Sequence, residues 1–142
     1  MEGSLDEIDY VLDELAPVGF QIPTNSHGIY PGDSRFHLVF DKLSERGATV
    51  FFHPTSCNIP NRDGGIERIT PIPGVPSPIQ EFMFDTTRAP TSLFTSGTVH
   101  LCTGITFVTC HCGATFPPTL ARIAEFSSLL VLGWDRDHRA GG

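Results

Sequence analysis

The sequence predicts a parallel α/β fold built as one compact domain. Stretches in which apolar residues recur at helical spacing alternate along the chain with short, continuous apolar runs. The run ATVFFH at 48–53 has no polar alternation, which is typical of a strand covered on both faces of a parallel sheet. With 142 residues, 39% of them hydrophobic, the chain is long enough to bury one core.

The N-terminal part predicts a helix within residues 1–15 and a strand over residues 18–22. The helix has a stripe of apolar residues and is ended by Pro17. Its many acidic residues are interpreted as a solvated helix face. The stripe consists of Leu5, Ile8, Val11, Leu12 and Leu15.

A second helix is predicted before the strand at 48–53. Asp33 or Ser34 can cap its start, and Gly47 suits the left-handed residue that commonly ends a helix. Residues 54–76 are rich in Pro and Gly, so we expect a long loop that is either functional or disordered. The apolar positions of this helix are Phe36, Val39, Phe40 and Leu43.

A third helix is predicted from Ser77, with Pro78 at its first position. Pro90 is expected to kink or divide it, because proline cannot donate the helical hydrogen bond. The residues expected on its buried face are Ile79, Phe82, Met83, Leu93 and Phe94.

The last predicted elements are a strand over 105–110 and a helix over 117–130. Residues 131–142 show no periodicity, and we expect them to form a loose tail outside the domain. The positions of this helix expected to face inward are Leu120, Ile123 and Leu130.

Composition excludes several classes of partner. The net charge of -7, with no basic run, repels phosphate backbones, so we expect no nucleic-acid partner. No apolar stretch approaches the roughly 20 residues that span a bilayer, and the acidic N-terminus is unlike a secretory signal. We therefore expect a cytoplasmic protein without membrane contact, whose four cysteines are thiols. They are Cys57, Cys102, Cys110 and Cys112.

Two histidines stand where parallel α/β proteins place their ligand sites, beyond the carboxyl ends of the strands. His53 closes one predicted strand and His111 follows the next. Histidine is both a common metal ligand and the usual acid or base near neutral pH, so this pair is the leading candidate for a site. His27 has a weaker case, and the remaining histidines are interpreted as surface residues.

The neighbouring Cys110, His111 and Cys112 do not predict a metal site of their own. Successive strand residues point to opposite sides, so three consecutive side chains cannot easily share one tetrahedral ion. Arg122, on the last predicted helix, has the planar fork that suits a carboxylate, although its position also fits an ordinary exposed helix residue.

Four stretches together carry a family resemblance: VGFQIPTNSHGIYPGDSRFHLVFDKLSERGATVFFHP, FMFDTTRA, SGT at 96–98 and ITFVTCHCGATFPPTLARI. They resemble the metal-dependent decarboxylases of the amidohydrolase superfamily, which include aminocarboxymuconate-semialdehyde, resorcylate and fungal 6-methylsalicylate decarboxylases. The resemblance extends over about residues 12–130 and implies the middle of a (β/α)8 TIM barrel, roughly strands four to six with their helices. Residues 1–130 are accordingly expected to form the central part of the barrel domain.

The resemblance also implies roles for single residues. His53 is similar to the family's metal-ligand histidine after the fifth strand, His111 to its catalytic histidine, and Arg122 to an arginine that binds the substrate carboxylate, in some members across a dimer interface. Arg88 matches a family position and is assigned a structural role. The implied cofactor is a divalent metal, zinc before manganese, without an organic cofactor.

The implied activity is that of a carboxy-lyase releasing CO2 from a small aromatic carboxylic acid such as 6-methylsalicylate, in a possible homodimer. The family's first-strand metal motif and its final aspartate ligand have no counterpart in these residues, so we expect the 142-residue chain alone to be inactive. Two alternatives stay open. One is a metal-dependent hydrolase of the same superfamily, and the other is a non-catalytic fragment or pseudoenzyme that binds a full-length relative.

Overall fold

A computed structural model of the chain describes residues 2–56, 58–60, 63, 65–68 and 72–130. At its centre is a three-stranded sheet in the order β1-β2-β5, with both pairings parallel. In the register of this sheet, Val50 lies between Phe20 and Phe107. The parallel α/β prediction is therefore confirmed. The strands are β1 (Phe20–Pro23), β2 (Thr49–His53) and β5 (Thr106–Thr109).

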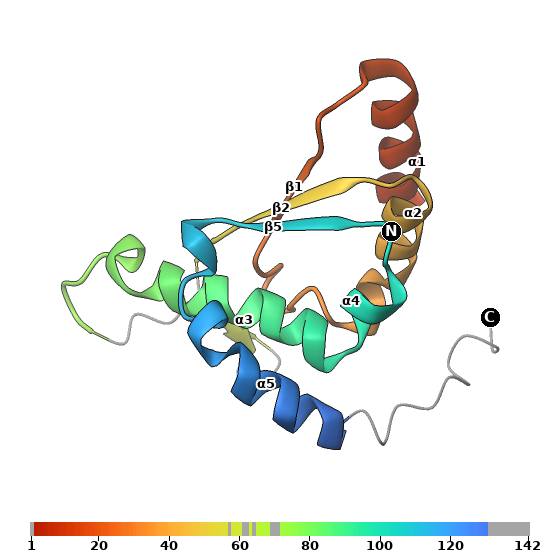
Figure 1. Cartoon of the computed structure of the whole chain (residues 1–142). Helices are drawn as coiled ribbons and strands as arrows, with labels where there is room; N and C mark the ends of the chain where they lie inside the picture. Colours follow the sequence, from red (N-terminus) through yellow and green to blue (C-terminus); the bar gives the residue numbers. More distant parts are fainter. Residues whose placement is uncertain (1, 57, 61–62, 64, 69–71, 131–142) are drawn as a thin grey trace.

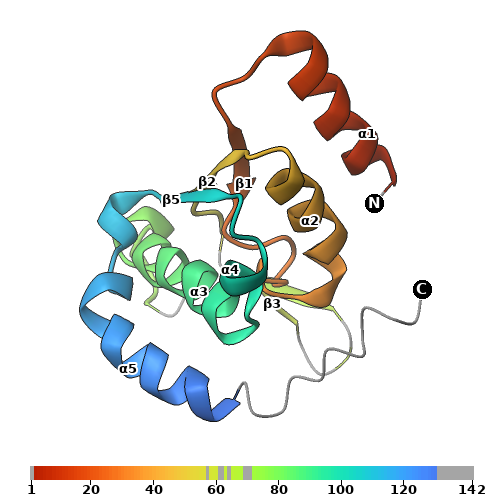
Figure 2. The ribbon, with the colours of Figure 1, turned by 45° about the vertical axis from the view of Figure 1, so that its right-hand side comes forward.

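The helices form layers on this sheet. Helix α3 lies along one face of it, and α5 packs on the side of α3 away from the sheet (Figures 1 and 2). Short 3-10 turns precede α2 at Ser34–Phe36, precede α3 at Ser77–Ile79 and follow β5 at His111–Gly113. The helices are α1 (Glu2–Tyr10), which continues as a π-helical turn over Val11–Leu15, α2 (His37–Glu45), α3 (Glu81–Thr95), α4 (Thr98–Leu101) and α5 (Phe116–Leu130).

The core lies between the sheet and the helices. Val50 and Phe52 of β2 are fully buried, whereas Thr49 and Phe51 are half-buried and His53 is exposed. This alternation corrects the expectation that β2 is covered equally on both faces. Since side chains of a strand alternate between its faces, the helices bury one set and leave the other more accessible. The nine residues of the core cluster are Ile8, Phe40, Leu43, Ala48, Val50, Phe52, Leu93, Cys102 and Ile105.

The predicted long loop at 54–76 contains secondary structure of its own. Two short strands, β3 (Asn58–Pro60) and β4 (Ile66–Arg68), pair in antiparallel fashion. Pro90 does not divide the third helix, which is continuous, and its side chain is buried. Burial of this helix face offsets the hydrogen bond that Pro90 cannot donate.

Several apolar residues expected to face inward are exposed, among them Leu15 of the predicted N-terminal stripe, which is 60% exposed. Val18 precedes β1 and is 92% exposed, Ile79 is 68% exposed and Leu120 is 37% exposed. The buried face of α3 instead includes Glu81, Asp85 and Thr86. Periodicity identifies the side of a helix that is apolar, but burial depends on which neighbouring elements cover it.

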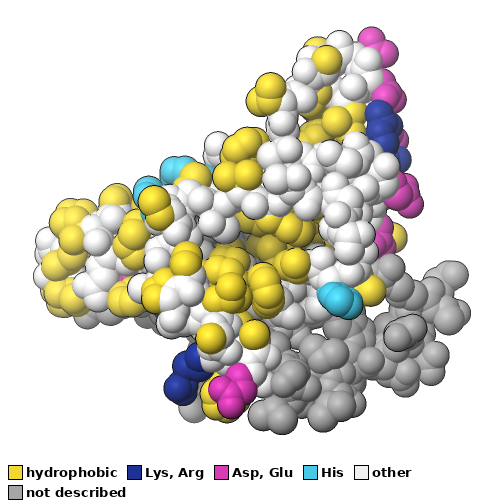
Figure 3. Space-filling model, viewed as in Figure 1, with side chains coloured by type: hydrophobic (Ala, Val, Ile, Leu, Met, Phe, Trp, Pro, Cys, Tyr) yellow, Lys and Arg dark blue, Asp and Glu magenta, His cyan; other side chains and the backbone are white. Residues whose placement is uncertain are grey.

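The acidic residues of α1 are more than a solvated face. Asp9 pairs with Lys42 at 2.6 Å and with Arg46 at 3.3 Å, and Arg46 also pairs with Asp13. Basic and acidic side chains lie close together along this edge of the molecule (Figure 3). These partly exposed pairs contribute little stability individually, but they fix how α1 lies on α2 while Ile8 enters the core.

Among the described residues, no helix is long and apolar enough to cross a membrane. The tail expected at residues 131–142 lies outside the described residues.

Gly32 marks a close contact between the loop before α2 and the end of α3. Its amide donates to Ser92 Oγ at 3.1 Å, and a Cβ here would overlap the Ser92 carbonyl and lie 2.7 Å from Ser96 Oγ. We expect Gly32→Ala to lower the free energy of unfolding by about 1–3 kcal/mol, the usual cost of overpacking, measured by urea denaturation. Gly3→Ala is the control, because a Cβ there meets nothing within 4 Å. Equal stability of the two variants would contradict the steric explanation.

Candidate functional site

The carboxyl end of the sheet brings the two leading histidines together. His53 is the last residue of β2, and His111 follows β5 after one intervening residue. Their ring centroids are 6.0 Å apart with an interplanar angle of 54°. Both side chains are exposed, so a small molecule or ion can reach both rings.

The ring of His53 is held by its neighbours. Its Nδ1 lies 2.9 Å from the carbonyl oxygen of Pro54, and its ring is nearly perpendicular to that of Phe82, at 79°, with centroids 6.5 Å apart. Because a carbonyl oxygen only accepts hydrogen bonds, Nδ1 carries the proton and Nε2 keeps its lone pair. A hydrogen bond from one ring nitrogen to a carbonyl is the usual way in which a protein orients a metal-binding histidine.

His111 stands in a strained turn. Its φ is 51°, and positive φ values continue through Cys112 at 53°, Gly113 at 75° and Ala114 at 52°. Non-glycine residues in this region cost on the order of 1–3 kcal/mol each and cluster at functional sites. The turn is closed by hydrogen bonds from the Gly113 amide to the Cys110 carbonyl and from the Ala114 amide to the His111 carbonyl. This geometry points to a functional role for the segment that carries His111.

The residues present fit part of a metal site. His53 offers an unprotonated Nε2, the lone pair that a divalent transition metal requires of histidine. In the described part of the chain, no group of three or more His, Cys, Asp or Glu side chains is close enough to hold an ion. Cys102, Cys110 and Cys112 are not in disulfide bonds in the described part of the chain, and Cys57 lies outside the described residues. The described part of the chain thus supplies one metal ligand, His53 Nε2, but not a complete set of ligands.

Arg122 lies apart from the histidines, on the outer helix α5. Its side chain is exposed, and its guanidinium carbon lies 5.3 Å from the centroid of the Phe126 ring. Among the described residues, no hydrogen bond, ion pair or ring contact joins Arg122 to His53 or His111. The structure therefore brings together two of the three residues singled out from the sequence.

The other basic candidates lie elsewhere. Arg88 is exposed on α3, His27 and His100 are exposed, and His37 begins α2 half-buried. His138 lies outside the described residues.

A buried carboxylate next to the site was missed from the sequence. Asp85 on α3 is fully buried, and three side chains donate hydrogen bonds to it. The hydroxyl of Thr24 and the amide of Asn25, at 2.9 Å, reach one oxygen, and the hydroxyl of Tyr30 reaches the other at 2.6 Å. The one available signal was an aspartate inside an apolar helical stretch, FMFDTTRA. A buried charge requires partners, which here come from the loop after β1.

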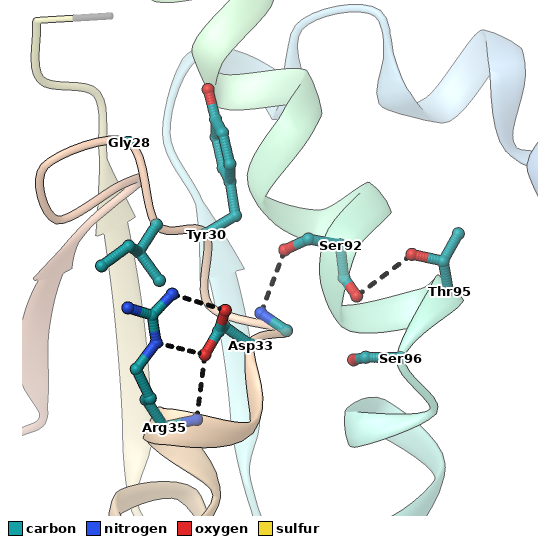
Figure 4. A pocket seen from close by; sticks show the side chains of 9 residues that line it. Gly28, Tyr30, Asp33, Arg35, Ser92, Thr95 and Ser96 are labelled. Carbon is teal, nitrogen blue, oxygen red and sulfur yellow. Dashed lines mark hydrogen bonds and ion pairs between the residues drawn. The ribbon is translucent and has the colours of Figure 1, made fainter. Parts of the chain in front are cut away.

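A hollow of about 440 Å³ opens elsewhere, between the loop before α2 and the end of α3 (Figure 4). Arg35 donates to both carboxylate oxygens of Asp33, at 2.7 and 2.8 Å, and this hydrogen bonding holds the pKa of Asp33 at about 2. Arg35 and Asp33 thus form a partly exposed ion pair in the lining of the hollow. None of the residues that line the hollow was singled out from the sequence as a catalytic, metal-binding or substrate-binding residue. The pair of His53 and His111 therefore stays the candidate site. The hollow is lined by Gly28, Ile29, Tyr30, Gly32, Asp33, Arg35, Ser92, Thr95 and Ser96.

Comparison with known proteins gives matches over most of the chain. The family model described as Amidohydrolase matches residues 1–138. Decarboxylase macB of Penicillium terrestre is 30% identical over 86% of the chain and 36% of its own length. The 6-methylsalicylic acid decarboxylase acuB of Aspergillus aculeatus is 32% identical over 85% of the chain and 35% of its own length.

A solved structure shares the fold. The 5-carboxyvanillate decarboxylase LigW from Sphingomonas paucimobilis superposes with a TM-score of 0.74 at 23% identity, over 91% of this chain and 37% of that one. The chain thus spans about a third of the length of the proteins it matches.

Proposed function

The chain belongs to the amidohydrolase family, and from this premise we propose that it supplies part of the active site of a metal-dependent decarboxylase acting on an aromatic carboxylic acid. The observation that carries the proposal is the pairing of His53 and His111 at the carboxyl ends of neighbouring parallel strands, with ring centroids 6.0 Å apart. Support comes from the relatives that are themselves decarboxylases, one of them of 6-methylsalicylic acid. Residues 1–130 are proposed to be the central part of the barrel domain.

The two histidines are proposed to have different roles. His53 would hold a divalent metal, zinc or manganese, through Nε2, because its Nδ1 already donates to the Pro54 carbonyl. When bound, the metal supplies positive charge that stabilises the negative charge developing on the substrate oxygens as CO2 leaves. His111, exposed beside it on a strained turn, would deliver the proton that takes the place of the carboxylate on the substrate carbon.

Arg122 is proposed to bind the substrate carboxylate from a second subunit. It is exposed on the outer helix and lacks contact with the histidines of its own chain, as the described residues show. Its guanidinium lies over the Phe126 ring, which restrains it while its edge N–H groups stay available to a carboxylate.

The test is release of CO2 from 6-methylsalicylate with added zinc or manganese, measured on the chain alone and on the chain joined to the remaining strands of an amidohydrolase barrel. We expect His111→Ala to retain metal and to lose turnover by roughly 100- to 10,000-fold, the usual contribution of a general acid or base.

His100→Ala is the matched control, because His100 is exposed on α4 and lies outside the site. Undiminished CO2 release by His111→Ala would refute the assigned role. Hydrolysis of a lactone or amide without release of CO2 would favour a hydrolase of the same family.

A further inference from the structure

Asp85 occupies a position that the proposed reaction does not explain. It is buried on the face of α3 that meets the sheet, yet it reaches residues of the β1 loop that are 60 and 61 positions away in the chain. We infer that Asp85 is a positioning residue that, through Thr24 and Asn25, orients the imidazole of His53. As a statement about a metal ligand, the inference rests on the proposed function, but its geometry can be tested without metal or substrate.

The first step is the set of donors that converge on Asp85. Thr24, Asn25 and Tyr30 all present a hydrogen to its carboxylate oxygens. A carboxylate can accept from all three at once, since it offers about four lone-pair sites on two oxygens. The acceptor at this position therefore orients the side chains of Thr24 and Asn25, just after β1.

The second step leads from Thr24 and Asn25 to the loop that follows His53. The Thr24 hydroxyl, having donated its hydrogen to Asp85, accepts the Thr55 amide at 3.3 Å. The Asn25 side-chain amide donates to Asp85 and, at 3.3 Å, to the Ser56 carbonyl. Both residues thus join the buried carboxylate to the backbone of Thr55 and Ser56.

The third step leads from this loop to the imidazole. Pro54 is buried and is followed directly by Thr55, and its carbonyl accepts the hydrogen of His53 Nδ1 at 2.9 Å. If the loop moves, the carbonyl moves with it, and the imidazole loses the contact that keeps the proton on Nδ1 and Nε2 free. Asp85 therefore sets which nitrogen of His53 is available to a ligand.

The experiment is nitrogen-15 NMR of the His53 ring in the metal-free 142-residue chain, at a pH where the imidazole is neutral. We expect the Nδ1-protonated tautomer to dominate in the wild type and to fall at least to half of its population in Asp85→Ala and in Thr24→Val. Thr24→Val replaces the hydroxyl by a methyl group of similar shape, so it keeps the packing and removes the link through Thr24 while the link through Asn25 stays. Protection of the Thr55 amide from hydrogen exchange should fall by up to about tenfold, as expected for one lost hydrogen bond.

Two variants separate positioning from general destabilisation. Asp85→Asn keeps one oxygen toward Thr24 and Asn25 and turns its amide toward the Tyr30 hydroxyl, which can accept, so we expect the wild-type tautomer to be retained. Leu43→Val weakens the core away from this loop and should also leave the tautomer unchanged. An unchanged tautomer in a folded Thr24→Val chain, verified by circular dichroism, overturns the inference. A tautomer that shifts as much in Leu43→Val as in Thr24→Val also overturns it.

Zinc titration of the same variants, in the chain joined to the remaining strands of an amidohydrolase barrel, tests the proposed function separately. If the tautomer responds to Thr24→Val but zinc leaves the His53 ring signals unperturbed, the positioning role stands and the metal role of His53 fails. If zinc perturbs the His53 ring signals while the tautomer populations are the same in Thr24→Val as in the wild type, the metal role stands and the positioning role is overturned.

Discussion

When the chain is joined to the remaining strands of an amidohydrolase barrel, we expect His53→Ala to lose zinc binding while the fold is retained. The imidazole is exposed at the end of β2, so its removal leaves no cavity in the core. Its Nε2 has the lone pair that can bind a metal, because Nδ1 donates its hydrogen to the Pro54 carbonyl. Losing a ligand should weaken binding by more than the roughly 10- to 100-fold lost on removing a ligand's supporting partner. Elemental analysis of zinc and manganese in the purified wild-type and variant chains measures the effect.

The His53→Ala result needs a matched control. His100→Ala also removes one exposed imidazole, from α4, and should leave the metal content unchanged. Equal zinc in the His53→Ala and wild-type chains would show that His53 is not a ligand. Circular dichroism of both variants verifies that the fold is intact.

The adjacent residue, Phe52, should behave in the opposite way. Its side chain is fully buried, and its ring stacks on that of Phe107, with centroids 6.0 Å apart and planes inclined by 17°. We expect Phe52→Ala to lower the free energy of unfolding by about 3–5 kcal/mol, because it removes apolar contacts and leaves a cavity. This is a large share of the roughly 5–15 kcal/mol that stabilises a typical domain. Urea denaturation followed by circular dichroism measures the change.

Phe51→Ala is the control for the Phe52 prediction. Phe51 carries the same side chain one position earlier in β2, but it is half-buried on the other face of the sheet. Its replacement should therefore cost less. If the two variants lose equal stability, the one-sided covering of the sheet described above is wrong.

Much of the fold could be predicted from local sequence. The strands at 20–23, 49–53 and 106–109 lie within a few residues of their predicted positions, because continuous apolar runs bounded by Pro and Gly are a local signal. Gly47 has the expected positive φ, at 63°, and the Asp33 carboxylate caps the turn before α2. The placement of both histidines at one edge followed from the parallel order of the strands alone.

Other features had no local signal strong enough to predict them. The pairing of β3 with β4 occurs inside a stretch rich in Pro and Gly, whose composition favours a loop. The exposure of Val18 and Leu120 depends on which elements cover them, and the type of a residue does not determine which elements pack against it. For the same reason, the lack of a contact between Arg122 and the two histidines, within the described residues, could not be predicted from its place on a helix.

Local sequence patterns were sufficient to locate the ends of the two strands that His53 and His111 follow. Because parallel strands have their carboxyl ends at one edge of the sheet, the two histidines were then expected side by side. The hydrogen bonds around Asp85, by contrast, were decided by the packing of α3 against the loop after β1. Asp85 meets Thr24 across 61 positions of sequence, and such a contact forms only when the core brings the two segments together. A buried carboxylate must then find donors wherever the fold places them, which is why its partners could be identified only in three dimensions.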